Sequence, residues 1–435
     1  MRTIRSVVIA LVVVGGCFGN PSAATWHIKP DGTGDAATIQ DAILYLAQSG
    51  DTVLLAPGTY TGVGNRDIGF PRWGIVVTSE AGPEATIIDC QGFGRAFILD
   101  AFSAVISGLT MTNGNSAAGL LPGPGGAVYC DNLEGQAPTE ISNNVFIQNT
   151  ATADGGAIYC GQHTVVSIIN NTFIENSTTN VGGGIFCYQA ATVTISGNIL
   201  NRNTGGLGGG ICCWFGLATI SNNTLVGNTA TDTGGGICCM LTNSSSLVSY
   251  NTITANTAAR GGGVAYAGGG TVSYNVICRN QAEIAGGAIE CEGGTGPMGN
   301  TLISQNTLSE NSAPSGGGIF IYGPTSPTIE NTIIAFSSEG EGISCGSGTP
   351  TIARCNVYGN AGGDALCPTG GSENFSLDPQ FCGINGSGNY WLQSDSPCAP
   401  SLTPFHQLVG ALGVGCGGVS TQEKTWGAVK ALYRE

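Results

Sequence analysis

Charged side chains are scarce in this chain of 435 residues, where they make up 9% of the total. Thirteen Lys and Arg and three His stand against 28 Asp and Glu, which gives a formal net charge of −15 at pH 7. Nucleic acid and anionic membranes are therefore disfavoured as partners, because both repel a polyanion. Neutral glycans and Ca²⁺ are compatible with this charge. The chain also lacks an apolar run long enough to span a bilayer, so we predict no transmembrane span.

Glycine is abundant instead, with 72 residues, and much of it falls in a motif that repeats along the chain. The motif has two or three glycines, an aliphatic residue and usually a cysteine two positions later, and it recurs every 24 to 30 residues. A fixed period of this size indicates a repeat architecture. The copies of this glycine motif are GGAVYC (Gly125–Cys130), GGAIYC (Gly155–Cys160), GGGIFC (Gly182–Cys187), GGGICC (Gly208–Cys213 and Gly234–Cys239), GGGVAY (Gly261–Tyr266), GGAIEC (Gly286–Cys291), GGGIFI (Gly316–Ile321) and GEGISC (Gly340–Cys345).

Asparagine recurs with even stricter spacing. Each of seven asparagines has an aliphatic or aromatic residue three positions earlier and Ile or Val eight positions earlier, as Leu200 and Ile195 precede Asn203. Asparagine tolerates the left-handed corner of a turn, and identical side chains on stacked strands can bond to one another. We therefore predict a structural ladder made of Asn149, Asn176, Asn203, Asn228, Asn256, Asn280 and Asn311.

Each repeat holds short runs of alternating side chains that are too brief and too rich in Gly and Asn for helices. One such coil cannot bury its apolar face alone, whereas stacking it on its neighbours gives a continuous interior. The sequence predicts an all-β fold, a single-stranded right-handed parallel β-helix of about eleven rungs spaced roughly 4.8 Å apart. A propeller blade needs about 40–45 residues and leucine-rich repeats need a helical return, so both fit worse.

The first 24 residues have the features of an export signal. Arg2 and Arg5 precede the apolar run Val7–Val14, and Ser22-Ala23-Ala24 suits cleavage. Val14-Gly15-Gly16-Cys17 also resembles a lipobox, in which Cys17 would be lipidated. Both interpretations place the mature protein outside the cytoplasm, at the cell surface or beyond it.

The remaining chain divides into four predicted parts. Residues 25–62 form an N-terminal cap, because Ile39, Ala42, Ile43 and Leu46 make the apolar stripe of an amphipathic helix and an open stack needs a cap. Residues 63–363 are the β-helix repeats, 364–416 a C-terminal cap with cysteines, and 417–435 a tail. Within the tail, Thr425–Tyr433 predicts a short helix that either packs on the end or acts as a sorting signal.

The opening of the chain resembles that of the pectin-lyase-like β-helix superfamily. The matching residues are Asp31-Gly32-x-Gly34, Thr38-Ile39-Gln40-x-Ala42-Ile43, Gly50-Asp51-Thr52-Val53 and Ala56-Pro57-Gly58-Thr59-Tyr60. Gly155-Gly156-Ala157-Ile158 and Phe173–Asn176 are similar to the repeats of chlamydial polymorphic outer-membrane proteins. The resemblance covers residues 29 to about 345 and implies the fold, but it implies little about activity because one fold hosts many functions.

Cysteines belong to two groups. Those of the glycine motif share the interior face with the aliphatic residue two positions earlier and behave as small hydrophobes; the outward Cys212 and Cys238 are the better disulfide candidates. Ser376–Cys382, Asn389–Cys398 and Gly410–Cys416 look like the closing segment of secreted bacterial β-helix repeat proteins, and with Cys367 this region holds four cysteines. An exported protein can hold these four as disulfides, with three possible connectivities.

The catalytic motifs that this fold usually carries are not visible. Lyase chemistry needs Ca²⁺-binding carboxylates and a basic residue on neighbouring rungs, and the rungs offer chiefly Arg202, Arg260 and Arg279. Hydrolysis needs paired carboxylates, and His163 and His406 lack partner patterns. We predict no metal site and no cofactor, with Ca²⁺ only for a lyase-like enzyme.

The outward column of the glycine motif is the candidate ligand surface. Loop lengths vary most beside this column, and such faces often bind ligands in solenoids. Its aromatic rings can stack on sugars, or can simply cover the sheet. The candidate residues are Tyr129, Tyr159, Phe186, Trp214, Glu290 and Phe320.

The functional prediction is an exported, non-catalytic protein for carbohydrate binding, adhesion or surface display. Its partner would be a polysaccharide, a cell-envelope glycan or a protein surface. The alternative is a divergent polysaccharide lyase or another glycan-degrading enzyme of the same fold.

Overall fold

The computed structural model describes residues 23–120, 122–131, 138–162, 164–189, 191–293, 301–367, 371–383 and 389–416. Several predictions from the sequence lie outside these residues. They are the export signal up to residue 22, the lipidation of Cys17, the role of His163, and the tail with its predicted helix at Thr425–Tyr433.

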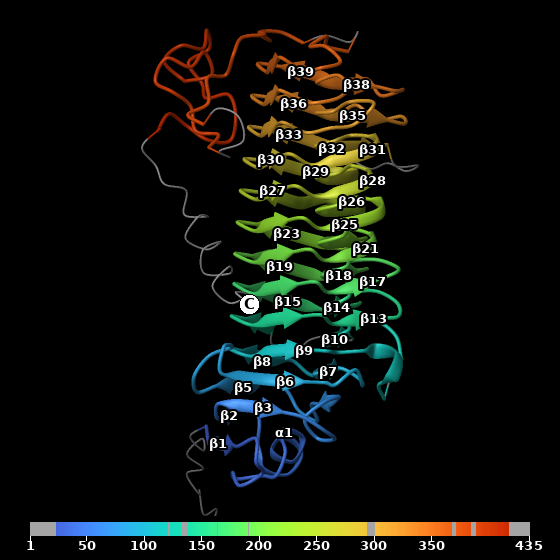
Figure 1. The fold of residues 1–435 in the computed structure, drawn as a ribbon, viewed down its shortest axis with the longest axis vertical. Helices are drawn as coiled ribbons and strands as arrows, with labels where there is room; N and C mark the ends of the chain where they lie inside the picture. Colours follow the sequence, from blue (N-terminus) through green and yellow to red (C-terminus); the bar gives the residue numbers. More distant parts are fainter. Residues whose placement is uncertain are drawn as a thin grey trace, which may run out of the picture.

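The described chain winds as a parallel β-solenoid of about twelve turns, which confirms the predicted fold class (Figure 1). Sheet B contributes one strand to each turn. Its strands are β3 (Gly58–Tyr60), β6 (Thr86–Asp89), β9 (Thr110–Thr112), β12 (Val145–Ile147), β16 (Thr172–Ile174), β20 (Ile199–Asn201), β24 (Thr224–Val226), β27 (Thr252–Thr254), β30 (Val276–Cys278), β34 (Thr307–Ser309), β37 (Ile333–Ala335) and β40 (Asn356–Tyr358).

Sheet A has 22 strands in two parallel columns that the long strands β26 (Ile237–Ser249) and β29 (Val264–Ser273) join. One column follows the glycine motif: β4 (Ile68–Gly69), β7 (Phe97–Asp100), β10 (Val128–Asp131), β14 (Ile158–Cys160), β18 (Ile185–Tyr188), β22 (Ile211–Trp214), β32 (Ile289–Glu292), β35 (Ile319–Tyr322) and β38 (Ile343–Cys345). The other is β1 (Thr25–Ile28), β2 (Thr52–Leu55), β5 (Ile75–Ser79), β8 (Ala104–Ser107), β11 (Thr139–Ser142), β15 (Val165–Ile169), β19 (Thr192–Ser196), β23 (Leu217–Ser221), β33 (Thr301–Ser304), β36 (Thr328–Glu330) and β39 (Thr351–Ala353).

Sheet C is the shortest and precedes the glycine motif in the middle turns. Its strands are β13 (Thr150–Ala151), β17 (Ser177–Thr178), β21 (Thr204–Leu207), β25 (Thr229–Thr233), β28 (Thr257–Arg260) and β31 (Gln281–Ala285). The described helical segments are α1 (Ile39–Asp41), the π-helix η1 (Ala42–Leu46) and the 3₁₀ turn η2 (Ser116–Ala118).

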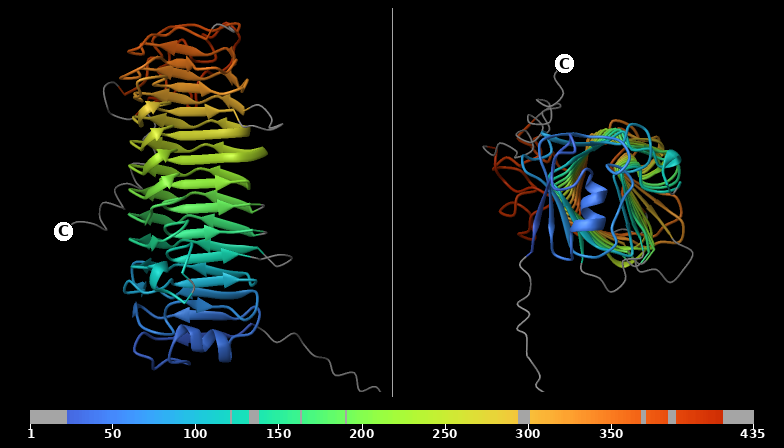
Figure 2. Two further views of the ribbon diagram at one scale, coloured as in Figure 1. Left: turned by 90° about the vertical axis from the view of Figure 1, so that its right-hand side faces the viewer. Right: turned by 90° about the horizontal axis from the view of Figure 1, so that it is seen from below.

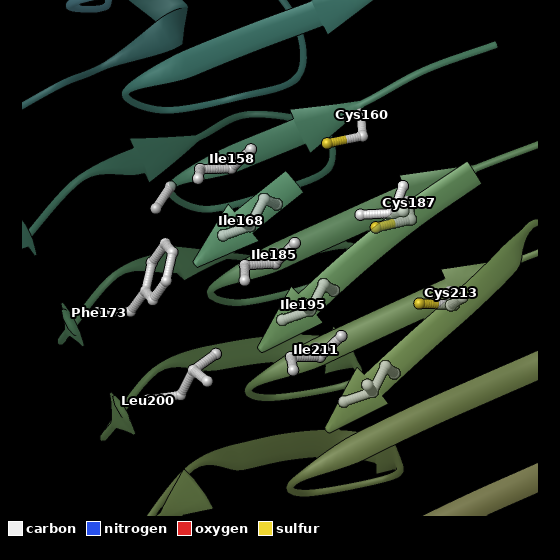
Figure 3. Packing of buried hydrophobic residues seen from close by; sticks show 14 of the residues in the cluster. Ile158, Cys160, Ile168, Phe173, Ile185, Cys187, Ile195, Leu200, Ile211 and Cys213 are labelled. Carbon is white, nitrogen blue, oxygen red and sulfur yellow. The ribbon is translucent and has the colours of Figure 1, made fainter. Parts of the chain in front are cut away.

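Equivalent residues of successive turns lie directly above one another, so the interior consists of columns. Ile168 pairs in register with Ile195, and Ile195 with Ile220. Figure 3 shows these columns side by side, including the stack of Cys160, Cys187 and Cys213. All of these side chains are buried, so the alternation of the strands predicts the core correctly.

The seven predicted asparagines form one buried ladder. The Nδ2 of each of the first six donates to the Oδ1 of the next asparagine at 2.9–3.1 Å and to a backbone carbonyl oxygen, and that of Asn311 donates to backbone carbonyl oxygens. Their backbone is not left-handed, contrary to expectation: the residue before each asparagine takes that conformation, as Arg202 does with φ 53°. A side chain that points into the core cannot also form the outward corner.

A second ladder, which the sequence analysis did not single out, runs parallel to the first and five residues ahead of it. The Nδ2 of each of the first six members donates to the Oδ1 of the next at 2.9–3.1 Å. Its members are Asn144, Asn171, Asn198, Asn223, Asn251, Asn275 and Asn306. Together the two ladders satisfy the amide groups at two corners of every turn that they cross.

A short helical segment lies at the N-terminal end of the stack (Figure 2, right). Ile39, Ala42 and Ile43 are buried in the same core as the first turns, whereas Leu46 is half-buried. The predicted apolar stripe is therefore used, although the segment is one turn of α-helix followed by a π-helix rather than a regular helix.

The C-terminal segment folds back along the side of the solenoid (Figure 1). Phe381, Tyr390 and Val409 pack against Val276 and Ile333 on the outer face of sheet B. Two disulfides hold this region, Cys345–Cys367 and Cys382–Cys416.

The predicted pairing among four C-terminal cysteines is therefore wrong in part. Cys367 bonds to Cys345, the last cysteine of the interior column, and not to one of the other three C-terminal cysteines. Cys398 is a free, buried thiol that accepts a hydrogen bond from Asn356. Only Cys382 and Cys416 pair within the predicted set.

Candidate ligand-binding site

The alternation of side chains along each glycine-motif strand defines an outward column of residues. Because side chains of a strand alternate between its faces, the residue between the aliphatic and the cysteine positions points away from the core. The register places these residues in one column, in the order Tyr129, Tyr159, Phe186, Cys212, Cys238, Ala265, Glu290 and Phe320.

This column is largely covered rather than exposed. The first glycine of each motif has φ between 59° and 73°, so the chain turns back sharply and lies over the outward residue four positions later. A Cβ atom on Gly208 would be 2.6 Å from the Cβ of Cys212. Glycine is required there both for its conformation and for this close approach.

One prediction about this face is wrong. Cys212 and Cys238 are neighbours in register but remain free, buried thiols, so they do not form the proposed disulfide. Of the predicted ligand-binding residues, Tyr159, Phe186 and Glu290 are buried. What remains open on this face are two separate clusters, one on the middle turns and one further along the stack.

The first cluster lines a half-open pocket with a volume of about 260 Å³, which we call the aromatic pocket. Its aromatic side chains come from three successive turns, and two polar residues complete the wall. The lining residues are Asp154, Tyr159, Asn180, Val181, Phe186, Tyr188, Trp214 and Phe215. Three of the predicted site residues, Tyr159, Phe186 and Trp214, thus meet in one place.

The rings of the aromatic pocket support one another. Tyr159 lies 5.9 Å from Phe186, and Phe186 lies 5.9 Å from Tyr188, measured between ring centroids. Trp214 stacks on Phe215 at 6.1 Å with an interplanar angle of 15°. Phe215 is 43% exposed and has a φ of 59°, a left-handed conformation that is uncommon for a bulky residue. Tyr129 stacks on Tyr159 from outside the pocket at 5.4 Å.

The polar side of the pocket is a carboxylate held by an amide. Asp154 Oδ1 accepts hydrogen bonds from Asn180 Nδ2 at 2.6 Å and from the backbone N–H of Val181 at 3.3 Å. Burial raises the pKa of Asp154, and these two hydrogen bonds oppose that shift in part. The carboxylate is fixed in place although it is partly removed from water.

The second cluster contains the other two predicted residues. Arg260 Nη1 lies 3.2 Å from Glu290 Oε1, and the same guanidinium lies over the ring of Tyr322 at 5.9 Å. Phe320 stacks on Tyr322 at 6.2 Å. Burial raises the pKa of Glu290 to about 7, against the opposing effect of Arg260.

The other pocket residues were not predicted from the sequence, and only one of them, Tyr188, has a sequence position that indicates its place on the outer face. Tyr188 follows Phe186 by two positions on β18, so alternation places both on the outer face. Phe215 comes after its strand has ended, and Asp154 and Asn180 lie in turns before the glycine motif. Nothing in their spacing predicts that these turns close over one cavity.

The other two basic residues considered for catalysis, Arg202 and Arg279, each form an ion pair with a glutamate. Arg202 pairs with Glu175 at 3.6 Å and Arg279 with Glu310 at 2.9 Å, both at left-handed corners of the coil. In the part of the chain that the structure describes, no three His, Cys, Asp or Glu side chains are arranged to hold a metal ion. Among the same residues, no helix is long and apolar enough to cross a bilayer.

The stacked sheets define a parallel β-helix. The structure matches a PL6 family alginate lyase, AlyGC, with a TM-score of 0.51 and 14% identity, over 92% of this chain and 58% of the lyase. Two further structures match with lower scores. Pectate lyase Pel9A has a TM-score of 0.39 and 11% identity over 90% of this chain and 96% of the lyase. The A-module of the Azotobacter vinelandii mannuronan C-5 epimerase AlgE6 has a TM-score of 0.38 and 15% identity over 76% of this chain and 92% of the module.

One repeat also matches a known family by sequence. Residues 145–161 match the Chlamydia polymorphic membrane protein repeat. This segment includes Asn149 of the first ladder and Asp154 and Tyr159 of the aromatic pocket. A search of curated proteins with the whole sequence finds no match. At 14% identity the structural likeness establishes a shared fold.

Proposed function

We propose that this chain is an exported, cell-surface β-helix that binds glycan through the aromatic pocket and does not cleave it. The pocket is the single observation that carries the proposal. It joins five aromatic rings with one fixed carboxylate and one amide, and aromatic rings offer a rigid apolar face beside polar groups.

The size of the pocket favours recognition of one sugar unit at a time. At about 260 Å³ it is smaller than the range of roughly 300–1,000 Å³ that is typical of sites for drug-sized ligands. Tyr188 and Trp214 are neighbours in register and are both half-buried, so they offer ring surface to a ligand. A longer polysaccharide would pass over the surface and place single residues into the pocket.

The matched repeat supports a location at the cell surface, because it is named after a polymorphic membrane protein. The predicted export signal agrees with this location. The structural neighbour AlyGC carries the name of an alginate lyase, which supports a glycan as the ligand.

A divergent lyase is the second candidate, and the Arg260–Glu290 pair favours it. A carboxyl group with a pKa of about 7 suits proton transfer near neutral pH. However, Glu290 is only 3% exposed, so a polysaccharide has no direct access to the carboxylate. Binding without cleavage is therefore the better-supported function.

One set of variants tests the proposal. We expect Trp214→Ala and Tyr188→Ala to weaken glycan binding about tenfold or more on an array, because stacking surface is lost. Trp73→Ala removes an exposed tryptophan outside the pocket lining and should bind like the wild type. The same proteins are incubated with pectin and alginate, with and without Ca²⁺, and assayed for unsaturated uronate. Full binding by both pocket variants would refute the site, and product release that Glu290→Gln abolishes would favour the lyase.

A further inference from the structure

We infer that the aromatic pocket selects a positively charged sugar, an amino sugar whose ammonium group lies among the rings and against Asp154. This inference deepens the proposed glycan binding and rests on it. It comes from the composition of the pocket wall, which has five aromatic residues and one carboxylate and, among the residues that the structure describes, no Lys, Arg or His.

The rings make the pocket attractive to a cation. The face of an aromatic ring carries the negative part of its quadrupole, so a cation within about 6 Å of the centroid is stabilised, and Trp is the best partner. Flat stacking of a neutral sugar requires one or two ring faces. Here rings from three successive turns line one cavity of about 260 Å³, which resembles the arrangement that recognises ammonium groups.

Asp154 adds a counter-charge that has unused hydrogen-bonding capacity. Both of its hydrogen bonds go to Oδ1, from Asn180 and Val181. Among the described residues, Oδ2 receives none. A primary ammonium group keeps three N–H donors, so it can bond to this oxygen while its charge faces the rings. Burial disfavours the charged carboxylate, and a bound cation would remove that penalty.

The charge of the whole chain points the same way. A net charge of −15 attracts a cationic polysaccharide at long range and repels a polyuronate. A uronate carboxylate in the pocket would meet both Asp154 and the electron-rich ring faces. Acidic sugars are therefore the ligands that this wall excludes most strongly.

Matched oligosaccharides whose amino groups are either free and charged or acetylated and neutral provide the test. A glucosamine hexamer and the fully N-acetylated hexamer share one backbone, and calorimetry below pH 7 compares their affinities for the full chain. We expect the charged hexamer to bind about tenfold more tightly. Asp154→Asn should remove this preference while retaining weak binding of both. Glu140→Gln, which removes an exposed carboxylate outside the pocket lining, should leave it unchanged.

Three controls separate the possible failures. If Trp214→Ala binds the charged hexamer like the wild type, binding is diffuse attraction to a polyanion and the inference is wrong. If the N-acetylated hexamer or an oligouronate binds better, the inference is wrong although glycan binding stands, whereas no glycan binding at all overturns both. Tighter binding of choline chloride than of the charged hexamer would also overturn the amino-sugar assignment. Circular dichroism and thermal unfolding verify that each variant is folded.

Discussion

At the scale of single residues, Glu290 shows how the coil removes an ionisable group from water. Its position on β32 points outward, yet the glycine corner at Gly286 covers it, so the carboxyl is 3% exposed. Arg260 supplies the one basic contact to it in the described chain, at 3.2 Å. Burial prevails over this contact and raises the pKa from 4.5 to about 7.

The raised pKa of Glu290 predicts that the stability of the folded protein decreases as the pH rises from about 4.5 to above 7. Between about pH 4.5 and 7 the folded state holds a proton that the unfolded state has released, so the contribution of Glu290 is fully present at pH 4 and lost at pH 8. Glu290→Gln should therefore raise the free energy of unfolding at pH 8 by up to about 3 kcal/mol, and change it little at pH 4. Urea unfolding at both pH values measures this.

The neighbouring carboxylate provides the control for Glu290. Glu292 lies two residues further on the same strand and is half-buried. Glu292→Gln should shift stability by less than Glu290→Gln at pH 8. An equal gain from both variants, or a loss from Glu290→Gln at pH 8, would contradict the assignment.

At the scale of elements, the asparagine ladders hold the corners of the coil. Asn203 Nδ2 donates to Phe173 O at 3.2 Å and to Asn228 Oδ1 at 2.9 Å, and its Oδ1 accepts from Asn176. All three asparagines are fully buried. Each ladder amide therefore satisfies groups on the turns before and after its own.

Truncating one ladder residue should cost more than its own hydrogen bonds. Asn203→Ala leaves the backbone N–H of Asn176 without its acceptor, removes one of the two acceptors of Asn176 Nδ2, and removes the side-chain donor to Phe173 O. Each buried group left unsatisfied costs about 1–3 kcal/mol. We expect a loss of at least about 3 kcal/mol in chemical unfolding, with faster hydrogen exchange in the turns on both sides.

The adjacent corner supplies the matched control. Arg202 has an exposed side chain and a surface ion pair with Glu175, so Arg202→Ala should cost no more than about 1 kcal/mol. Similar losses for Arg202→Ala and Asn203→Ala would mean that the ladder contributes no special stability.

At the scale of the whole molecule, the C-terminal segment covers the outer face of sheet B over the last turns. Tyr390 packs there with Phe381 and donates a hydrogen bond to Glu310 at 3.2 Å, although 80 residues separate the two in sequence. The disulfide Cys382–Cys416 closes the segment on itself, and Cys345–Cys367 ties its start to the last glycine-motif strand.

Removing the disulfide inside the C-terminal segment should loosen that segment and spare the coil. The double variant Cys382→Ala, Cys416→Ala is expected to lower stability by about 3 kcal/mol, with increased hydrogen exchange confined to residues after 371. Peptide mapping under non-reducing conditions should find Cys398 as a free thiol. A peptide in which Cys398 is linked to Cys382 would contradict this arrangement.

The repeating pattern of the chain by itself determined the architecture. Aliphatic residues such as Ile168, Ile195 and Ile220 recur at fixed positions, and a coil can bury them only by stacking in register. The interior cysteine column and the asparagine ladder follow from the same pattern, because local alternation decides which face each side chain takes.

Only the tertiary structure decided which outward residues reach solvent and which cysteines pair. The left-handed glycine at each corner turns the chain back over the outward residue four positions later, which covers Cys212 and Glu290. The aromatic pocket stays open between Tyr188, Trp214 and Asp154. Strand alternation predicts the face of the sheet on which a side chain lies. Its exposure to solvent depends on other segments that cover that face, and the local sequence does not predict where those segments run.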